Sequence, residues 1–441
     1  MVSNREDESG NQHGSGKRIS WILPGILCAG FLIAGLILWK SVWIEICQWQ
    51  ASRNLQSHHA TEALSWIEQA YELDRQNAET VLTLARAQRR ANQVEDAVET
   101  LKKLFQLSGQ TEELQREQWL VEAQVGDLKN LEQHLPDMLI DPRGNAADIC
   151  ETFVNSCILN YRFADAQRVI EVWQADFPED PLPHYYQGRI LEHKGNWSQA
   201  ESEFNAALKL SPEHIPSAYN LARIKLSQNQ VDAALEIYKR CLQQQNQQAA
   251  ALLGMARCLS MQQDVAAARK ILKQVQQMPE NQIMKAFREV GDPAHVARNA
   301  VALHRGQLEL SAGNYHQAVT NLETAVSLNP KDRKARLALA DAYRGLGELK
   351  KAEVQLQVMQ KSQAAITRLD ECFDLLQKDL TNAELRAEIG EIFLEHISEN
   401  QGIVWLKNAL YYDPDNQRAT QALKQYFEQL EYEKQNQVSE E

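Results

Sequence analysis

Residues that break helices are scarce in this chain, which has only 19 glycines and 12 prolines among 441 residues. Such a composition favours a mostly helical protein with short turns between its helices. The chain is also too long for one ordinary hydrophobic core unless its fold is elongated or repetitive. We therefore expect an all-helical fold, and an internal repeat is the first feature to look for.

Excess positive charge is also missing, because the formal net charge at pH 7 is −13. A general nucleic-acid-binding protein needs a basic surface to neutralise phosphates, so we expect no nucleic-acid partner. The seven cysteines are dispersed and none belongs to a C-x-x-C motif, which argues against a disulfide framework or a cysteine metal site. Cys150 and Cys157 can share one helical face, and we expect both to be core residues.

Motifs of catalytic or metal chemistry are absent as well. The sequence contains no G-x-x-x-x-G-K-S/T, no H-E-x-x-H and no G-x-S-x-G. His58 with His59, and His184 with His193, lack the spacing that places two metal ligands on one helical face. We therefore expect no catalytic residue, no cofactor, no metal site and no small-molecule substrate, so the chain is not expected to be an enzyme.

One long apolar run stands near the N-terminus. It is "ISWILPGILCAGFLIAGLILW" at 19–39 and contains no charged residue. At 1.5 Å of rise per residue, a helix of this length covers about 31 Å, which is enough to cross a bilayer core. Trp39 and Trp43 stand at its end, where tryptophan favours the membrane interface. We predict an uncleaved transmembrane helix at 19–42, preceded by a disordered tail at 1–18.

A cleaved signal peptide is the alternative for this run, but its apolar region is normally shorter, about 7–15 residues, and a small-x-small cleavage site follows it. No good site of that kind follows the run, and Cys28 lacks the small preceding residue of a lipoprotein site. Basic residues set the orientation of a membrane helix. Three precede the run and two follow it: Arg5, Lys17, Arg18, Lys40 and Arg53. This bias favours a cytoplasmic N-terminus and an exported, periplasmic body, whereas the dispersed cysteines weakly favour the opposite.

Two stretches of the chain share one pattern: "GNWSQAESEFNAALKLSP" at 195–212 and "GNYHQAVTNLETAVSLNP" at 313–330. Their central alanine recurs at one constant spacing, which a single extra residue interrupts early on and two insertions of equal length interrupt later. The recurring alanines are Ala63, Ala97, Ala166, Ala200, Ala234, Ala268, Ala318 and Ala352. Apolar residues follow each alanine at four and seven positions, which places all three on one helical face.

Small residues mark where two helices meet in each unit. A second small position lies twelve residues before each reference alanine, and a turn glycine lies five before it at Gly195, Gly313 and Gly347. Small residues at the two facing positions let the helices approach closely, and large residues fill the groove between neighbouring pairs. One pair cannot bury its apolar face alone, so we expect the pairs to stack into a superhelix.

This pattern resembles the tetratricopeptide repeat, a helix-turn-helix unit of about 34 residues. The resemblance extends over most of 44–416. It implies an all-α solenoid of antiparallel helix pairs, preceded here by one transmembrane helix as in bacterial membrane-anchored proteins of this family. It also implies protein–protein interaction rather than catalysis. The expected parts are N-terminal units at 44–146 with a degenerate unit at 112–146, four in-register units at 147–282, an insertion at 283–298 and C-terminal units at 299–416.

Two insertions and a terminal helix complete this plan. Pro279, Gly291 and Pro293 predict that the first insertion is a short extra helix within a long loop. The second insertion lacks glycine and proline, which predicts a lengthened second helix extending over about 360–380, followed by a capping box of Thr381 and Glu384. The last parts are a capping helix at 417–435 and a disordered tail at 436–441.

The resemblance also implies that the ninth residue of each first helix lines a concave groove. That position holds an arginine in four units and an aromatic residue stands one turn earlier in two of them: Arg86, Arg189, Arg223, Arg257, Tyr185 and Tyr219. Arginine forks hold carboxylates or phosphates, and aromatic rings add contact area. The hypothesis is a groove for an extended acidic peptide. The alternative is that these arginines pair with neighbouring acidic side chains of the repeat.

The expected function is that of a membrane-anchored scaffold or adaptor, which recruits protein partners through its concave surface. An alternative is an assembly or regulatory factor of the cell envelope, of the type that serves lipopolysaccharide or cytochrome assembly. The lipopolysaccharide type carries a terminal C-x-x-C metal module that this chain lacks. An accessory region of a glycosyltransferase is disfavoured, because the residues after the repeats are too few for a catalytic domain.

Overall fold

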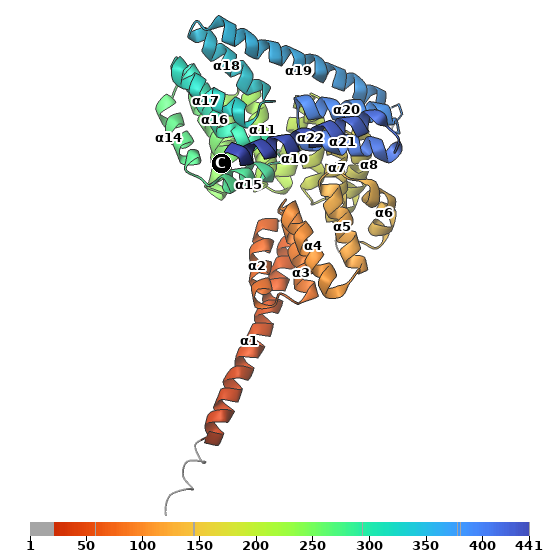
Figure 1. Ribbon diagram of the computed structural model, residues 1–441. Helices are drawn as coiled ribbons and strands as arrows, with labels where there is room; N and C mark the ends of the chain where they lie inside the picture. The colour runs from red at the N-terminus through yellow and green to blue at the C-terminus, as the bar shows by residue number, and fades with distance from the viewer. Residues whose placement is uncertain are drawn as a thin grey trace, which may run out of the picture. The chain divides into compact units, whose positions relative to one another are not determined.

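The computed structural model describes residues 22–57, 59–143, 146–292, 294–376, 378–379 and 381–440, with the backbone alone at 22–38, 294–295 and 433–440. These residues form 22 α-helices and no strand (Figure 1). The helices are α1 (Ile22–Gln56), α2 (Ala60–Leu73), α3 (Ala78–Arg90), α4 (Val94–Ser108), α5 (Glu112–Gln124), α6 (Lys129–Ile140), α7 (Ala146–Leu159), α8 (Phe163–Asp176), α9 (Leu182–His193), α10 (Trp197–Leu210), α11 (Ile215–Ser227), α12 (Val231–Gln244), α13 (Ala249–Met261), α14 (Val265–Gln276), α15 (Glu280–Glu289), α16 (Ala294–Ser311), α17 (Tyr315–Leu328), α18 (Arg333–Gly345), α19 (Leu349–Leu376), α20 (Ala383–His396), α21 (Glu399–Tyr412) and α22 (Gln417–Glu440).

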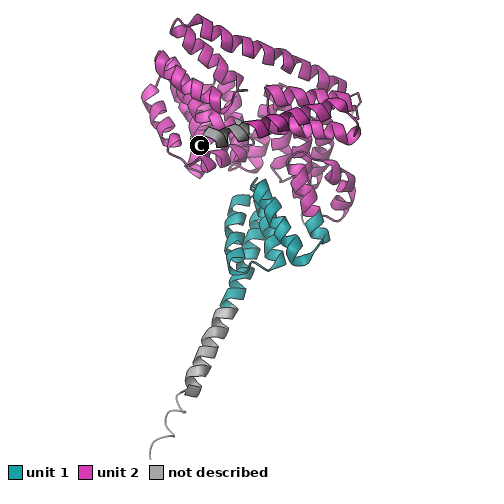
Figure 2. Cartoon of the chain, in the orientation of Figure 1, with its two compact units in different colours: residues 1–115 teal, residues 116–441 magenta. Residues whose placement is uncertain are grey.

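The chain divides into two compact units, the first ending at Gln115 and the second beginning at Arg116 (Figure 2). In the first unit, the C-terminal half of α1 packs on α2 and α3, and α3 pairs with α4. Cys47, Ala51 and Ile67 are fully buried at this contact. Because α1 is continuous from Ile22 to Gln56, its backbone runs without a break into the first helix of the first pair.

No helix in the described part of the chain is both long enough and apolar enough to cross a membrane. The predicted transmembrane helix at 19–42 lies partly outside that part, because nothing is described of 19–21 or of the side chains of 22–38. The predicted tail at 1–18 lies outside it entirely. Attachment to a membrane therefore stays a prediction.

Packing between the two helices of a pair explains the small residues of the repeat. A Cβ added at Gly188 of α9 would lie 2.7 Å from the ring of Phe204 in α10, and one added at Gly390 of α20 would lie 2.7 Å from the side chain of Leu406 in α21. Real carbon atoms do not approach so closely, so the large residue of one helix occupies the space that the glycine leaves. The facing alanines, Ala200 among them, are fully buried. The inference that small residues allow close approach is confirmed.

The turn between the helices of a pair has the left-handed backbone that favours glycine. Gly195 has φ 72°, but the equivalent positions of other units are occupied by Asn229 with φ 61°, Gln263 with φ 67° and Tyr161 with φ 54°. A left-handed conformation costs an ordinary residue about 1–2 kcal/mol. The tight turn is therefore imposed by the packing of the helix pair, and glycine only makes it less costly.

The two insertions and the C-terminal segment differ in detail from the prediction. The first insertion contains α15 (Glu280–Glu289), but the next helix already begins at Ala294 rather than after the predicted insertion at 283–298. The lengthened helix is α19, which ends at Leu376 and not near 380, and it links α18 with α20 (Figure 1). The last helix, α22, continues to Glu440, so the prediction of a disordered tail at 436–441 is wrong through residue 440.

The predicted capping box before α20 is displaced by one residue. Asn382 caps the helix, and its side-chain oxygen accepts the backbone N–H of Leu385 at 2.9 Å. The hydroxyl of Thr381 instead donates to Asp379 at 2.8 Å, and Glu384 accepts from Asn416 at 3.2 Å. Either residue type is a good N-cap, so the sequence did not decide between them.

The last helix pairs of the second unit contact its early pairs. The ring of Tyr161, in the turn between α7 and α8, stacks on Phe373 of α19 with centroids 4.0 Å apart and planes 15° apart. Asn160, beside it, accepts a hydrogen bond from Asn408 of α21 at 3.1 Å. The array of helix pairs in the second unit therefore closes on itself.

The six cysteines whose side chains the structure describes are unpaired and buried. Burial raises the pKa of Cys150 to about 12 and that of Cys241 to about 11. The thiols are protonated at neutral pH and pack as small apolar side chains, which agrees with their expected place in the core.

Candidate functional site

The predicted arginine row lies on the first helices of consecutive pairs in the second unit. Arg189 is on α9, Arg223 on α11 and Arg257 on α13. Tyr185 and Tyr219 precede the first two arginines by one helical turn. The guanidinium of Arg189 donates to the Tyr185 hydroxyl at 3.0 Å, and that of Arg223 lies 6.0 Å from the centroid of the Tyr219 ring.

A carboxylate of the chain itself occupies the predicted groove at Arg223. Asp292 lies in the connection between α15 and α16, and its carboxylate accepts from Arg223 Nη1 at 3.1 Å and from the Tyr219 hydroxyl at 3.1 Å. Glu192, at the end of α9, accepts a second hydrogen bond from the same guanidinium. Both carboxylates are largely buried, with side chains 11% exposed for Asp292 and 8% for Glu192.

The two residues before Asp292 are held against the same surface. The side-chain amide of Asn220 donates to the carbonyl of Val290 at 3.3 Å. Gly291 has φ 81°, and a Cβ added there would lie 2.5 Å from the Tyr185 hydroxyl and would also overlap the Arg189 guanidinium. Both the positive φ and the nearness of these two side-chain ends favour glycine at this position.

Helix α15 leads into this segment and is itself docked through polar groups. The amide of Gln248 donates to the carbonyl of Ala286 at 2.6 Å, and the amide of Gln245 donates to Glu289 at 3.2 Å. Phe287 is buried in the core of the second unit. The insertion therefore covers part of the surface that the first helices of these pairs present.

The electrostatics of the site fix the protonation of its members. Burial acts to lower the pKa of Arg223, but the charges of Asp292 and Glu192 outweigh it and raise that pKa above the usual value. Burial, followed by the charge of Asp292, raises the pKa of Tyr219 well above 10. Arg223 is therefore a permanent cation and Tyr219 a permanent hydroxyl donor, which suits recognition of a carboxylate.

The five predicted residues of the second unit do not form one open surface. Tyr185 and Tyr219 are buried, and Arg189 and Arg223 pair with groups of the chain, as the alternative interpretation anticipated. Arg257 is exposed and makes no hydrogen bond or ion pair with any described residue. Arg86 is half-buried on α3 in the first unit. Whether this row binds a peptide stays a prediction.

Sequence reasoning missed Asp292 and Glu192, the acidic partners of Arg223. Asp292 follows Gly291 and precedes Pro293, so the sequence marked this place as a turn within the insertion. A turn signal of that kind does not say where the turn docks. The contact joins residues 69 positions apart, which the repeat period does not predict.

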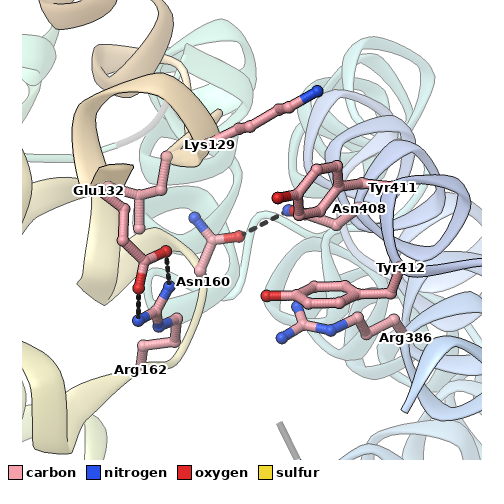
Figure 3. A pocket seen from close by; sticks show the side chains of 9 residues that line it. Lys129, Glu132, Asn160, Arg162, Arg386, Asn408, Tyr411 and Tyr412 are labelled. Atoms are coloured by element: carbon pink, nitrogen blue, oxygen red, sulfur yellow. Dashed lines mark hydrogen bonds and ion pairs between the residues drawn. The ribbon is translucent and has the colours of Figure 1, made fainter. Parts of the chain in front are cut away.

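A second polar cluster lines a small cavity of about 20 Å³ where α21 meets α6 and α7 (Figure 3). The guanidinium of Arg162 donates to both oxygens of Glu132, at 2.7 and 2.6 Å. Arg386 lies 4.4 Å from the ring centroid of Tyr412. The volume is roughly that of one water molecule, so the cluster joins helices and is too small for a larger ligand. Among the residues that the structure describes, no group of three or more His, Cys, Asp or Glu side chains could hold a metal ion.

The sequence profile of the tetratricopeptide repeat matches the chain at residues 54–116, 191–239, 225–283 and 309–370. With the stacked helix pairs, these matches show that the chain belongs to the tetratricopeptide repeat family. The family and the all-helical solenoid are thereby confirmed, and the general role of such repeats in protein–protein interaction follows. No curated protein sequence matches the chain.

Several solved structures match the chain at low sequence identity. The Cut9-Hcn1 hetero-tetramer of the APC/C is 13% identical, with 86% of this chain and 75% of that chain covered and a TM-score of 0.43. A tetratricopeptide repeat protein from Parabacteroides merdae is 18% identical, with coverages of 61% and 96% and a TM-score of 0.32. YrrB, described as a repeat protein with an unusual peptide-binding site, is 19% identical, with coverages of 50% and 97% and a TM-score of 0.24.

Proposed function

We propose that the chain is a membrane-anchored scaffold or adaptor that grips an extended acidic segment of a partner protein in its concave groove. The observation that carries the proposal is the carboxylate of Asp292 bound between Arg223 and Tyr219. It supports the expectation that the arginine row suits acidic groups. Arg257, the next member of the row, is exposed and has no carboxylate partner among the described residues, so it offers an open position for a partner.

The proposed activity is binding, without catalysis and without a cofactor or small-molecule substrate. The pKa values of Arg223 and Tyr219 are raised further from neutrality, which suits recognition better than proton transfer. The net charge of −13 supports protein partners over nucleic acid.

Membrane attachment through residues 19–42 is part of the proposal. It is supported by the uncharged run at 19–39 and by Trp39, which is 62% exposed and stacks on Trp43 with centroids 5.7 Å apart. An exposed tryptophan such as Trp39 suits a membrane interface. The proposed orientation has a cytoplasmic N-terminus and an exported body. Proximity labelling from a C-terminal fusion tests it, because recovery of cytoplasmic proteins alone would reverse the orientation.

Substitution of the open arginine tests the groove. Full-length chain carrying Arg257→Glu is compared with wild type in affinity capture, and bound proteins are quantified by mass spectrometry. Arg240→Glu is the matched control, because Arg240 is also exposed but lies on α12, the second helix of the preceding pair. We expect Arg257→Glu to lose partners that Arg240→Glu retains. Equal recovery by both variants would exclude the row as the binding surface.

The same comparison also bears on the alternative of a cell-envelope assembly factor, which would use the same groove with a different partner. The identity of the proteins lost with Arg257→Glu, together with the side of the membrane labelled, distinguishes a general adaptor from an assembly factor.

A further inference from the structure

The segment Val290–Asp292, here called the latch, is the turn that ends α15, and it places a carboxylate in the groove where an acidic partner would bind. Three groups of the latch contact the surface of α9 and α11. They are the carbonyl of Val290, the backbone of Gly291 and the carboxylate of Asp292. The carbonyl of Val290 accepts from Asn220 at 3.3 Å, and the carboxylate of Asp292 accepts from Arg223 at 3.1 Å. Its carboxylate matches the acidic ligand for which the arginine row is suited.

We propose that the latch is a built-in ligand of this groove, and that the partner displaces it with a segment that makes a similar turn, in which a glycine precedes an aspartate. The inference rests on the proposed groove-binding function. The preference for glycine follows from Gly291, where φ is 81° and where a Cβ would displace the side-chain ends of Tyr185 and Arg189. The requirement for a carboxylate follows from the paired donors Tyr219 and Arg223.

Departure of the latch leaves no buried charge without a partner. Arg223 is 38% exposed at its side chain and keeps its ion pair with Glu192 when Asp292 leaves. Removing one member of a buried pair is normally costly because the other member stays uncompensated. Here the second carboxylate removes that cost, so the site can exchange one carboxylate for another.

Helix α15 can remain in place during this exchange. Phe287 and Ile283 belong to the core of the second unit, and Gln248 holds the carbonyl of Ala286 at 2.6 Å. Val290 is also buried and is the apolar contact that a partner must replace. The moving part is therefore short. Its departure also breaks two backbone hydrogen bonds to the end of α15, from the N–H of Gly291 to the carbonyl of Arg288 and from the N–H of Asp292 to that of Phe287, each 3.0 Å long.

The tether sets how strongly the latch competes. A segment joined by a few residues has an effective concentration of about 1 mM or more, so a separate peptide with the same contacts binds the closed groove weakly. A partner can bind the groove more tightly than the latch does if it makes one contact that the latch does not make. Arg257, one pair further along the row and exposed, is positioned to supply it through a second carboxylate.

The test uses the chain's own sequence as a probe. A fluorescein-labelled peptide KAFREVGDPAH, identical to residues 285–295, is titrated into the full-length chain in detergent and followed by anisotropy. The variant Asp292→Ala removes the competing carboxylate, and Glu280→Ala is the matched control because Glu280 is an exposed acid at the start of α15. We expect Asp292→Ala to bind the peptide at least about tenfold more tightly than wild type, and Glu280→Ala to bind like wild type.

Two further arms establish the contacts. A peptide with asparagine in place of its aspartate, and the chain Asp292→Ala/Arg223→Gln with the original peptide, are both expected to lose most of the gain. Equal peptide affinity of wild type, Asp292→Ala and Glu280→Ala would overturn the proposal. If Asp292→Ala does not fold, hydrogen exchange on the wild type decides: saturating peptide must raise exchange at 289–292, and unchanged exchange refutes displacement.

The experiments distinguish a wrong latch proposal from a wrong groove-binding function. If Asp292→Ala gains no affinity while Arg257→Glu still loses its partners, the latch is a fixed part of the fold and the groove-binding function stands. If neither substitution changes any binding, both proposals fall.

Discussion

Replacing Asn160 with alanine should weaken the closure of the second unit. Asn160 is 3% exposed, and its side-chain amide donates to the carbonyl of Gly126 at 2.8 Å and to that of Ser156 at 2.9 Å. Its side-chain oxygen accepts from Asn408 at 3.1 Å. One buried side chain therefore links the turn after α5, the end of α7 and helix α21.

The expected cost follows from what each partner loses. The carbonyl of Ser156 keeps a backbone hydrogen bond at 3.1 Å, and Asn408 is half-buried, so water can reach it. The carbonyl of Gly126 loses its side-chain donor at a buried contact, which costs about 1–3 kcal/mol. With the small cavity added, we expect Asn160→Ala to lower the free energy of unfolding by about 2–3 kcal/mol.

Asn408→Ala is the matched comparison, because it removes only one of the three hydrogen bonds and leaves Asn160 with two partners. We expect a loss of about 1 kcal/mol. The double variant should cost less than the sum of the single ones, because both remove the same contact. Urea unfolding of the full-length chain gives these values.

Hydrogen exchange provides a local test of the same reasoning. Asn160→Ala should raise exchange at 402–412, although that segment is far away in sequence, because α21 loses its anchor on α7. If Asn160→Ala costs no more than Asn408→Ala, or leaves exchange at 402–412 unchanged, then the closure does not depend on this side chain and the argument fails.

Three further changes test packing, backbone strain and protonation. Gly188→Ala should cost about 1–3 kcal/mol by overpacking against Phe204, and Phe204→Leu in the same chain should recover part of it, as measured by urea unfolding; a stabilised Gly188→Ala chain would contradict this. Gln263→Gly should stabilise the chain by about 1 kcal/mol, because φ there is 67°, whereas Gln262→Gly at φ −80° should not; a matching rise in melting temperature for both would refute the strain. Burial lowers the pKa of His304 to about 4, so the unfolded chain binds a proton that the folded chain does not, and stability should fall by roughly 2–3 kcal/mol as pH drops from about 6.5 to 4. His304→Gln should flatten the dependence in that window, and an unchanged slope would show that other groups cause it.

The features of the fold that follow the repeat period could be predicted from the sequence. The constant spacing of the reference alanines located the helix pairs, because each pair must place a small residue against a large one, as at Gly188 and Phe204. The positions of the turns also followed, since Asn229 and Gln263 take the same left-handed backbone as Gly195. Predictions of which single residue caps a helix were less reliable, as the displaced cap at Asn382 shows.

Contacts that do not follow the repeat period could not be predicted from the sequence. Asp292 meets Arg223 only because the insertion folds back over the groove, and Asn160 meets Asn408 only because the array closes. Both depend on the curvature of the stacked pairs, which accumulates from small rotations between neighbours. A pattern of apolar residues fixes which face is buried, but it leaves those rotations undetermined.

Closure of the second unit has a consequence for how such a chain can change in evolution. An open stack of helix pairs tolerates the gain or loss of a pair, because each pair contacts only its neighbours. Here a duplicated or deleted pair would carry Asn408 away from Asn160 and Phe373 away from Tyr161. The number of pairs between α7 and α21 is therefore constrained as the number of strands is in a closed barrel, and variation in length should fall in the loops instead.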